Sequence, residues 1–244
     1  FKSMTTQLEE MRRLESFVES EVERFPRNIK IIDKKKDLKA IGELVASAKS
    51  IALHTEFDSG DILNRKINSL AMTTDGENIY LLREVDLGHD ELDKILKLCW
   101  EEDELMVASE HWKRDYFYAL QSNIIVNCNM FDVTQCHYVL DAGGKHDFPN
   151  IVREYLGHDL IPRSKKDPFL KDIEQEEKDN FISERAAMCF KLVALFEKEL
   201  LEKEMVHIFT DIDSKVSPIL SKMEKAGVVL DSQFFADYEK KLQK

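Results

Sequence analysis

The chain has 244 residues, with 35 lysines and arginines against 47 aspartates and glutamates, and so carries a formal net charge of -12. Hydrophobic residues make up 43% and charged residues 34%, which is typical of a folded globular protein and excludes an intrinsically disordered one. The acidic balance argues against a broad electrostatic surface for nucleic acid or anionic membrane, although it does not exclude a local basic groove.

Membrane and disulfide-rich classes are also excluded. The longest uninterrupted apolar runs are five residues, at 116–120, 186–190 and 192–196, so we expect no membrane span, and the first residues show no signal-peptide pattern. Cys99, Cys128, Cys136 and Cys189 form no C-x-x-C pair and have apolar neighbours. We expect buried, reduced thiols in a cytoplasmic protein.

The predicted elements begin with an amphipathic helix over 4–24, ended by Phe25-Pro26. A short β-like run at 29–32 and a helix over 37–48 follow. Strands are then expected at 50–53, 67–73, 78–82, 105–108 and 124–128, with an Asp75-Gly76 turn between the second and third. Helices are expected at 90–100, from Lys113, and at 131–140, 148–156 and 174–203. This order indicates an α/β fold with a mixed five-stranded sheet flanked by helices.

A second pattern starts near residue 204. One helix is expected over 208–225 with Gly227 as its stop, and another over 232–242 with Asp231 as its cap. This stretch resembles the opening of a further domain.

Polar side chains end the first of these strands and begin a later helix. His54 and Glu56 lie at the end of the strand, and Asp115 lies just inside the helix that follows the fourth strand. Strand ends and helix starts of α/β sheets gather ligands at one edge. Glu56 and Asp115 are therefore the first candidates for a hydrolytic two-metal site, which needs three or four carboxylates.

Five stretches carry a resemblance to a known family, and they are IALHTEFDSGD (51–61), SEHWKRD (109–115), MFDVTQCHYVLDAGGKHDF (130–148), FISERAA (181–187) and IDSKVSPILSKMEKAGVVLD (212–231). The chain resembles the 3′–5′ exonuclease domain of a family A DNA polymerase, the bacterial DNA polymerase I type, followed by the start of the polymerase domain. The resemblance implies a ribonuclease H-like exonuclease fold. It also implies a segment from a preceding domain at 1–26, an exonuclease-like domain at 27–203 and the first thumb helices of the polymerase at 204–244.

The family motifs are incomplete in this chain. The Asp-x-Glu motif reads His54-Thr55-Glu56, and in the second motif His111 replaces an asparagine while Asp115 is kept. The Tyr-x-x-x-Asp motif reads Phe181 to Arg185, so a hydroxyl is lost and a carboxylate has become a cation. Two of the four expected carboxylates remain.

These replacements predict a degenerate site. Two carboxylates carry too little negative charge to hold two divalent cations close together. Arg185 is expected to attract Glu56 and Asp115 and to replace the metal charge, because guanidinium pairs with carboxylates and stays protonated. Phe181 cannot orient an attacking water. We therefore expect neither a catalytic residue nor a bound metal in this segment, with His54, Glu56, Asp115, Phe181 and Arg185 as vestigial positions.

Two alternatives stay open. The first is an active nuclease with a rearranged site, in which His54, Glu56 and Asp115 bind Mg or Mn, with Glu184 as a further candidate. The second is an unrelated α/β interaction domain.

The partner expected from the resemblance is DNA, reached through a parent polymerase that acts in replication and repair and bound weakly by this segment alone. The remaining polymerase domain is the expected protein partner, with this segment as its scaffold. The basic run 163–166 is a candidate DNA contact but is interpreted as a solvated loop. Trp112, Tyr116 and Phe117 offer a base-stacking surface or, as we favour, core packing.

Overall fold

The strands at 50–57, 67–73 and 106–109 are built from short runs in which most residues are buried, as expected for a sheet covered on both faces. A computed structural model describes residues 28–242. Six strands form one mixed sheet in the order β1-β4-β3-β2-β5-β6. They are β1 (Asn28–Ile32), β2 (Ser50–Phe57), β3 (Ile67–Thr73), β4 (Asn78–Arg83), β5 (Met106–Ser109) and β6 (Asn129–Asp132). The sheet has one strand more than the sequence predicted because β1 pairs in parallel with β4.

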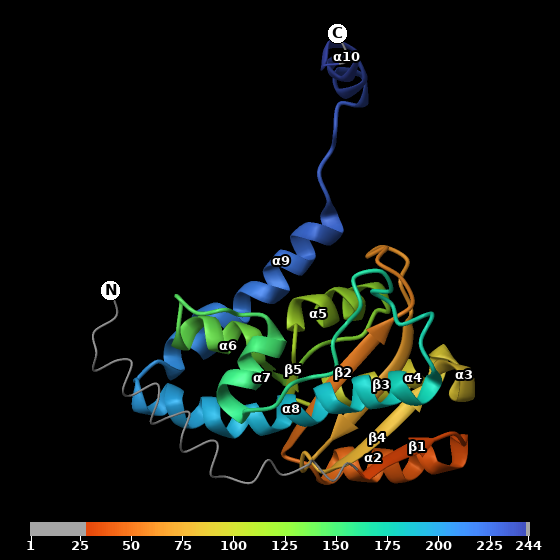
Figure 1. Ribbon diagram of the computed structural model, residues 1–244, viewed down its shortest axis with the longest axis vertical. Helices are drawn as coiled ribbons and strands as arrows, with labels where there is room; N and C mark the ends of the chain where they lie inside the picture. Colours follow the sequence, from red (N-terminus) through yellow and green to blue (C-terminus); the bar gives the residue numbers. More distant parts are fainter. Residues whose placement is uncertain (1–27, 243–244) are drawn as a thin grey trace.

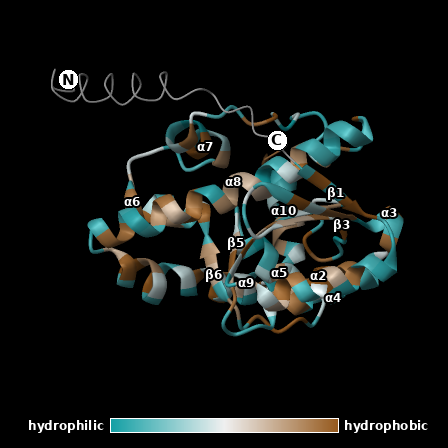
Figure 2. Cartoon of the chain, turned by 90° about the horizontal axis from the view of Figure 1, so that it is seen from below, coloured by the Kyte–Doolittle hydropathy of each residue, from teal (hydrophilic) through white to brown (hydrophobic). Residues whose placement is uncertain are grey.

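Helices cover both faces of this sheet (Figure 1). The helical elements are a 3₁₀ turn η1 (Lys35–Asp37), α2 (Leu38–Ser47), α3 (Glu84–Leu87), α4 (His89–Trp100), α5 (Trp112–Gln121), α6 (Val133–Leu140), α7 (Phe148–Leu156), α8 (Gln175–Glu202), a π-helix η2 (Ile208–Asp213), α9 (Ser214–Ala226) and α10 (Ser232–Leu242). The predicted α/β class with a mixed sheet is confirmed. In Figure 2 the strands are largely hydrophobic, whereas the helices carry hydrophobic and hydrophilic residues on different sides.

One predicted strand was wrong. Residues 124–128 are irregular, and the last strand is β6 (Asn129–Asp132), which overlaps the first two residues of the helix expected at 131–140. The apolar residues Ile124 and Cys128 are buried because this loop passes under the end of α4. There the N–H groups of Asn127 and Cys128 donate to the carbonyl of Trp100 at 2.8 and 3.0 Å. An apolar run alone cannot distinguish a buried loop from a strand.

The two faces of β2 have different surroundings. Ile51 and Leu53 belong to the core shared with α2, α4 and α5, whereas Ala52 belongs to the core shared with α6, α7 and α8. Side chains alternate between faces along a strand. His54 and Glu56 therefore lie on the α8 side, and Thr55 lies on the α5 side.

The C-terminal elements leave the body of the protein in steps. The η2–α9 pair packs on it through the buried residues Phe209, Ser217 and Ser221, whereas α10 has no buried residue and projects away (Figure 1). Gly227 ends α9 at φ 67°, and the Asp231 carboxylate accepts from the N–H of Phe234 at 2.9 Å, as predicted. The single helix predicted over 208–225 is divided into η2 and α9.

Three further expectations concern the N-terminal segment, the cysteines and membrane-spanning helices. The predicted helix over 4–24 and the segment 1–26 lie outside the described residues. All four cysteines are free and buried, as predicted. Within residues 28–242, no helix combines the length and the apolar composition needed to cross a membrane.

One carboxylate begins two helices near the end of the sheet. Asp132, the last residue of β6, accepts from the N–H of Trp112 at 2.8 Å and from the N–H of Gln135 at 2.9 Å. It therefore satisfies free N–H groups at the start of both α5 and α6. This double cap fixes where α5 begins, and α5 carries Asp115.

We expect Asp132→Ala to lower the free energy of unfolding by about 2 kcal/mol, because two helices lose their cap. The matched variant is Asp147→Ala, which removes the side-chain cap of α7 alone, and it should cost about 1 kcal/mol. Urea denaturation followed by tryptophan fluorescence measures both. Equal losses would contradict the double-cap interpretation.

Candidate functional site

Glu56 is the carboxylate that the sequence placed at the end of β2, and it is 3% exposed. Both of its oxygen atoms are engaged by one guanidinium. Arg163 donates from Nη1 to Oε1 at 2.8 Å and from Nη2 to Oε2 at 2.7 Å. Burial alone would raise the pKa of Glu56, but the hydrogen bonds from Arg163 and His54 lower it to about 2. Arg163 was expected to lie in a solvated loop, so this contact corrects that interpretation.

His54 lies between two carboxylates. Its Nε2 is 3.4 Å from Glu56 Oε2, and its Nδ1 is 3.5 Å from Glu110 Oε2 without a hydrogen bond there. Burial lowers the pKa of this imidazole more than the two carboxylates raise it. The ring is therefore neutral at pH 7, with its proton on Nε2 toward Glu56.

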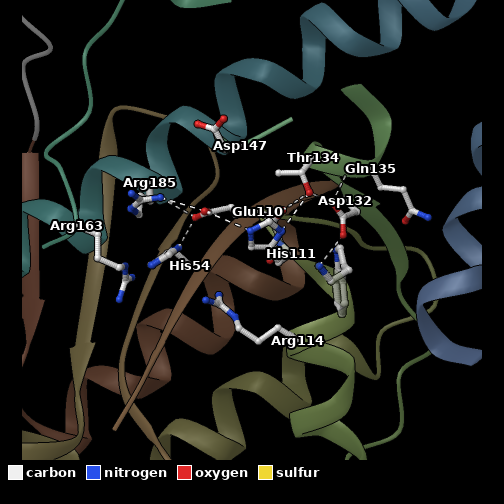
Figure 3. A network of polar contacts seen from close by, with 12 residues as sticks. His54, Glu110, His111, Arg114, Asp132, Thr134, Gln135, Asp147, Arg163 and Arg185 are labelled. Carbon is white, nitrogen blue, oxygen red and sulfur yellow. Dashed lines mark hydrogen bonds and ion pairs between the residues drawn. The ribbon is translucent and has the colours of Figure 1, made fainter. Parts of the chain in front are cut away.

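Arg185 is buried, and its partner is Glu110 at the end of β5. Nη1 of Arg185 lies 3.1 and 3.0 Å from the two oxygens of Glu110, and Arg185 and His54 both point to this carboxylate in Figure 3. Burial would raise the pKa of Glu110, but the positive charge of Arg185 lowers it to about 2. Arg185 does neutralise a site carboxylate, but the prediction that it pairs with Glu56 and Asp115 is wrong.

Phe181 packs against both guanidiniums. The centre of its ring lies 4.3 Å from Arg185 Cζ and 4.8 Å from Arg163 Cζ. Aromatic rings attract cations through their quadrupole, and the attraction is stronger where water is excluded. The residue that replaces the family tyrosine therefore holds two arginines in place, a role that the sequence analysis did not foresee.

Asp115 belongs to the opposite face of β2. Its Oδ1 accepts from the Thr55 hydroxyl at 2.6 Å, and its Oδ2 accepts from the Ser109 hydroxyl. Arg114 lies beside it, with Nε 3.4 Å from Asp115 Oδ1 and Nη2 donating to the Thr55 hydroxyl at 3.2 Å. Asp115 thus points to hydroxyls on the α5 side, whereas Glu56 points to Arg163 on the α8 side.

The other candidates lie further from these contacts. Glu184 faces the segment after α7, where it accepts from His158 Nε2 and from the N–H of Ile161, both at 2.8 Å. Trp112 and Phe117 are buried in the core, which favours packing over base stacking. His111, at the family asparagine position, is exposed and lies 3.1 Å from the Thr134 hydroxyl (Figure 3).

Three residues of the site were missed from the sequence. Glu110 carried a usable signal, because it directly follows β5, and strand ends were where site residues were expected. Arg114, next to Asp115 on the first turn of α5, carried a weaker one. Arg163 carried none, since it lies in a long irregular segment whose path only the tertiary structure shows.

Known structures with the same fold show which class of fold this is. The structure is similar to Escherichia coli RNase D, with a TM-score of 0.65 and 16% identity over 83% of this chain and 52% of that one. It is also similar to the POL domain of Pol1 from M. smegmatis in complex with DNA primer-template and dNTP, with a TM-score of 0.68 and 13% identity over 88% of this chain and 36% of that one. The fold is that of the ribonuclease H-like 3′–5′ exonucleases, as predicted.

Sequence comparison gives the family. The model of the 3′–5′ exonuclease family of DNA polymerase A matches residues 29–186. DNA polymerase I of Pseudomonas aeruginosa is 24% identical over 223 residues, which cover 80% of this chain and 23% of that protein. The chain therefore belongs to the 3′–5′ exonuclease family of DNA polymerase A, which confirms the resemblance and excludes an unrelated interaction domain. It spans between 12% and 23% of the length of the DNA polymerase I relatives compared.

The fold family implies divalent metal, as in Brucella melitensis NrnC with bound Mg²⁺, a structure with a TM-score of 0.62 and 10% identity over 82% of this chain and 92% of that one. The donors of this chain do not fit two such cations. Arg163 binds both oxygens of Glu56, so neither is open to a cation. The two ring nitrogens of His54 face different carboxylates, so one ion cannot bind His54 together with both Glu56 and Glu110. Across residues 28–242, no group of three or more His, Cys, Asp or Glu side chains is arranged to hold a metal ion.

The lowered pKa values of Glu56 and Glu110 predict acid sensitivity. A carboxyl group whose pKa falls from 4.5 to about 2 on folding stabilises the protein fully above pH 4.5 and loses that contribution as the pH falls toward 2. We expect each group to account for about 2 kcal/mol of lost stability between pH 6 and pH 3.

Urea denaturation at both pH values, monitored through the buried Trp100 and Trp112, measures this loss. In Glu56→Gln the difference between pH 6 and pH 3 should shrink. The exposed Glu43→Gln should behave like the parent protein. A pH dependence unchanged in Glu56→Gln would contradict the assignment.

Proposed function

We propose that this chain is a 3′–5′ exonuclease-like domain that has lost metal-dependent nuclease activity and serves as a scaffold in a DNA polymerase I-type enzyme. The bidentate contact of Arg163 with Glu56 carries the proposal, because it occupies both oxygens of the one carboxylate kept from the Asp-x-Glu motif. Arg185 likewise neutralises Glu110, and Arg114 lies beside Asp115. Each of Glu56, Glu110 and Asp115 thus faces a guanidinium where a metal-dependent nuclease would hold a cation to activate a water.

Charge replacement explains why the carboxylates persist without metal. A buried carboxylate is costly unless it is paired and hydrogen-bonded. Arginine is the suitable replacement, because its planar guanidinium binds both oxygens at once and does not deprotonate. The site thus retains its carboxylates as structural ion pairs.

The scaffold role rests on how α9 meets α5. Ser221 is fully buried in this contact, and its hydroxyl donates to the carbonyl of Lys113 at 2.9 Å. Lys113 Nζ lies 2.7 Å from Glu224, and Lys225 donates to the carbonyl of Leu120 near the other end of α5. In this proposal residues 1–26 come from a preceding domain, 27–203 form the exonuclease-like domain, and 204–244 begin the polymerase domain that α9 joins to it.

The wider role follows from the family. The parent enzyme acts in DNA replication and repair in the cytoplasm, and DNA reaches this segment through the polymerase domain. With a net charge of -12, the segment alone binds DNA weakly.

The activity test uses a 5′-labelled single-stranded oligonucleotide with Mg²⁺ or Mn²⁺. We expect no shortening above the rate without protein, because no cation pair is held. The Glu56→Ala/Asp115→Ala double variant should be indistinguishable from the parent chain, and an exonuclease domain with all four carboxylates serves as positive control. Metal-dependent degradation by the parent chain that the double variant lacks would refute the proposal and favour the rearranged site of His54, Glu56 and Asp115.

The scaffold contact can be tested by overpacking. Ser221→Leu should displace α9 from α5 and cost about 1–3 kcal/mol, because the buried position has no room for the added volume. Hydrogen exchange should then accelerate in both helices. The neighbouring Lys222→Leu, at an exposed position, should leave exchange unchanged. Unaltered exchange in Ser221→Leu would show that the contact does not hold α9.

A further inference from the structure

The connection between α7 and α8, residues 157–174, is long and irregular. Segments of this length without secondary structure are uncommon in compact domains and usually have a function. In Figure 1 it runs beside the loop that joins β2 to β3. Glu56 lies next to this loop, one residue before the end of β2. We refer to residues 157–174 as the α7–α8 connection.

The connection is held at its start by α8. Glu184 is 1% exposed and accepts from His158 Nε2 and from the N–H of Ile161. A buried carboxylate that binds a backbone N–H fixes the course of the chain there. Glu184, considered above as a metal ligand, is instead used to hold this segment.

The middle of the connection is held by the site. Nη1 of Arg163 donates to Glu56 and also to the carbonyl of Pro168, five residues further on. Arg163 therefore connects the chain on both sides of this bend, at residues 163 and 168, to Glu56. Lys165 and Lys166, which lie between Arg163 and Pro168, are exposed to solvent.

The end of the connection closes on the β2–β3 loop and on α8. A Cβ added at Gly60 would lie 3.0 Å from the ring of Phe169, so the ring fills the space next to this glycine. Leu170 is 3% exposed in the core with Phe181 and Ile182, at φ 52°. A leucine keeps this left-handed conformation only where its surroundings enforce it.

We propose that the α7–α8 connection is a latch that covers Glu56, and that the Arg163–Glu56 pair holds it in this position. The same contact that neutralises Glu56 thereby excludes a nucleic-acid strand from it. The inference concerns the site of the proposed function, but its test does not use nuclease activity, so either can fail without the other.

Limited proteolysis with trypsin tests the latch. Trypsin needs several residues in extended form, and the segment between Arg163 and Leu170 is too short for this while both ends are held. Releasing Arg163 should expose the bonds after Lys165 and Lys166. We expect Glu56→Gln and Arg163→Met to be cut there at least tenfold faster than the parent chain, with cut sites identified by mass spectrometry.

The matched control is Glu110→Gln. It also removes a buried carboxylate from the site, but Glu110 contacts Arg185 and not the connection, so its cutting rate should stay within twofold of the parent chain. Cleavage after Lys240 in α10, which has no buried residue, serves as internal standard. The double variant Glu56→Gln/Arg163→Met leaves no buried charge unpaired, so it decides the question if a single variant does not fold. Unchanged cutting in Arg163→Met, or equal acceleration in Glu110→Gln, would overturn the proposal.

Discussion

The arrangement depends on how negative charge is neutralised at the end of the sheet. Glu56 and Glu110 are buried and ionised, and each would destabilise the protein without a counter-ion. Arg163 and Arg185 supply these charges from two different segments. Because removing one partner leaves the other charge buried and unpaired, the loss of either arginine costs more than the pair itself contributes.

This charge balance links elements that are distant in sequence. Glu56 lies in β2 and Glu110 directly follows β5, whereas the arginines belong to α8 and to the connection before it. Phe181 packs against both guanidiniums, so one ring lies beside both ion pairs. The two ion pairs consequently hold the sheet, α8 and the α7–α8 connection together.

Helix α5 connects the site to the C-terminal elements. It starts at the double cap provided by Asp132, carries Arg114 and Asp115 on its first turn, and is contacted along its length by α9. The buried serines of α9 allow the two helices to approach closely. The helix that carries Asp115 therefore also positions α9.

Local patterns in the sequence were enough for most of the fold and for part of the site. Hydrophobic periodicity identified β3, α7 and α10 at their observed bounds. Position at a strand end singled out Glu56 as a candidate, and position at a helix start singled out Asp115. The loop at 124–128 was mistaken for a strand because burial under Trp100 and burial in a sheet require the same apolar residues. What the sequence by itself determined was the family, the α/β class and which family carboxylates are absent, because these depend on residue identity and short-range spacing. Only the tertiary structure decided which cation meets which carboxylate. Strand alternation places Glu56 on the α8 side of β2 and Thr55, which bonds Asp115 of α5, on the other side. The path of a long connection brings Arg163 to Glu56 across 107 positions of sequence.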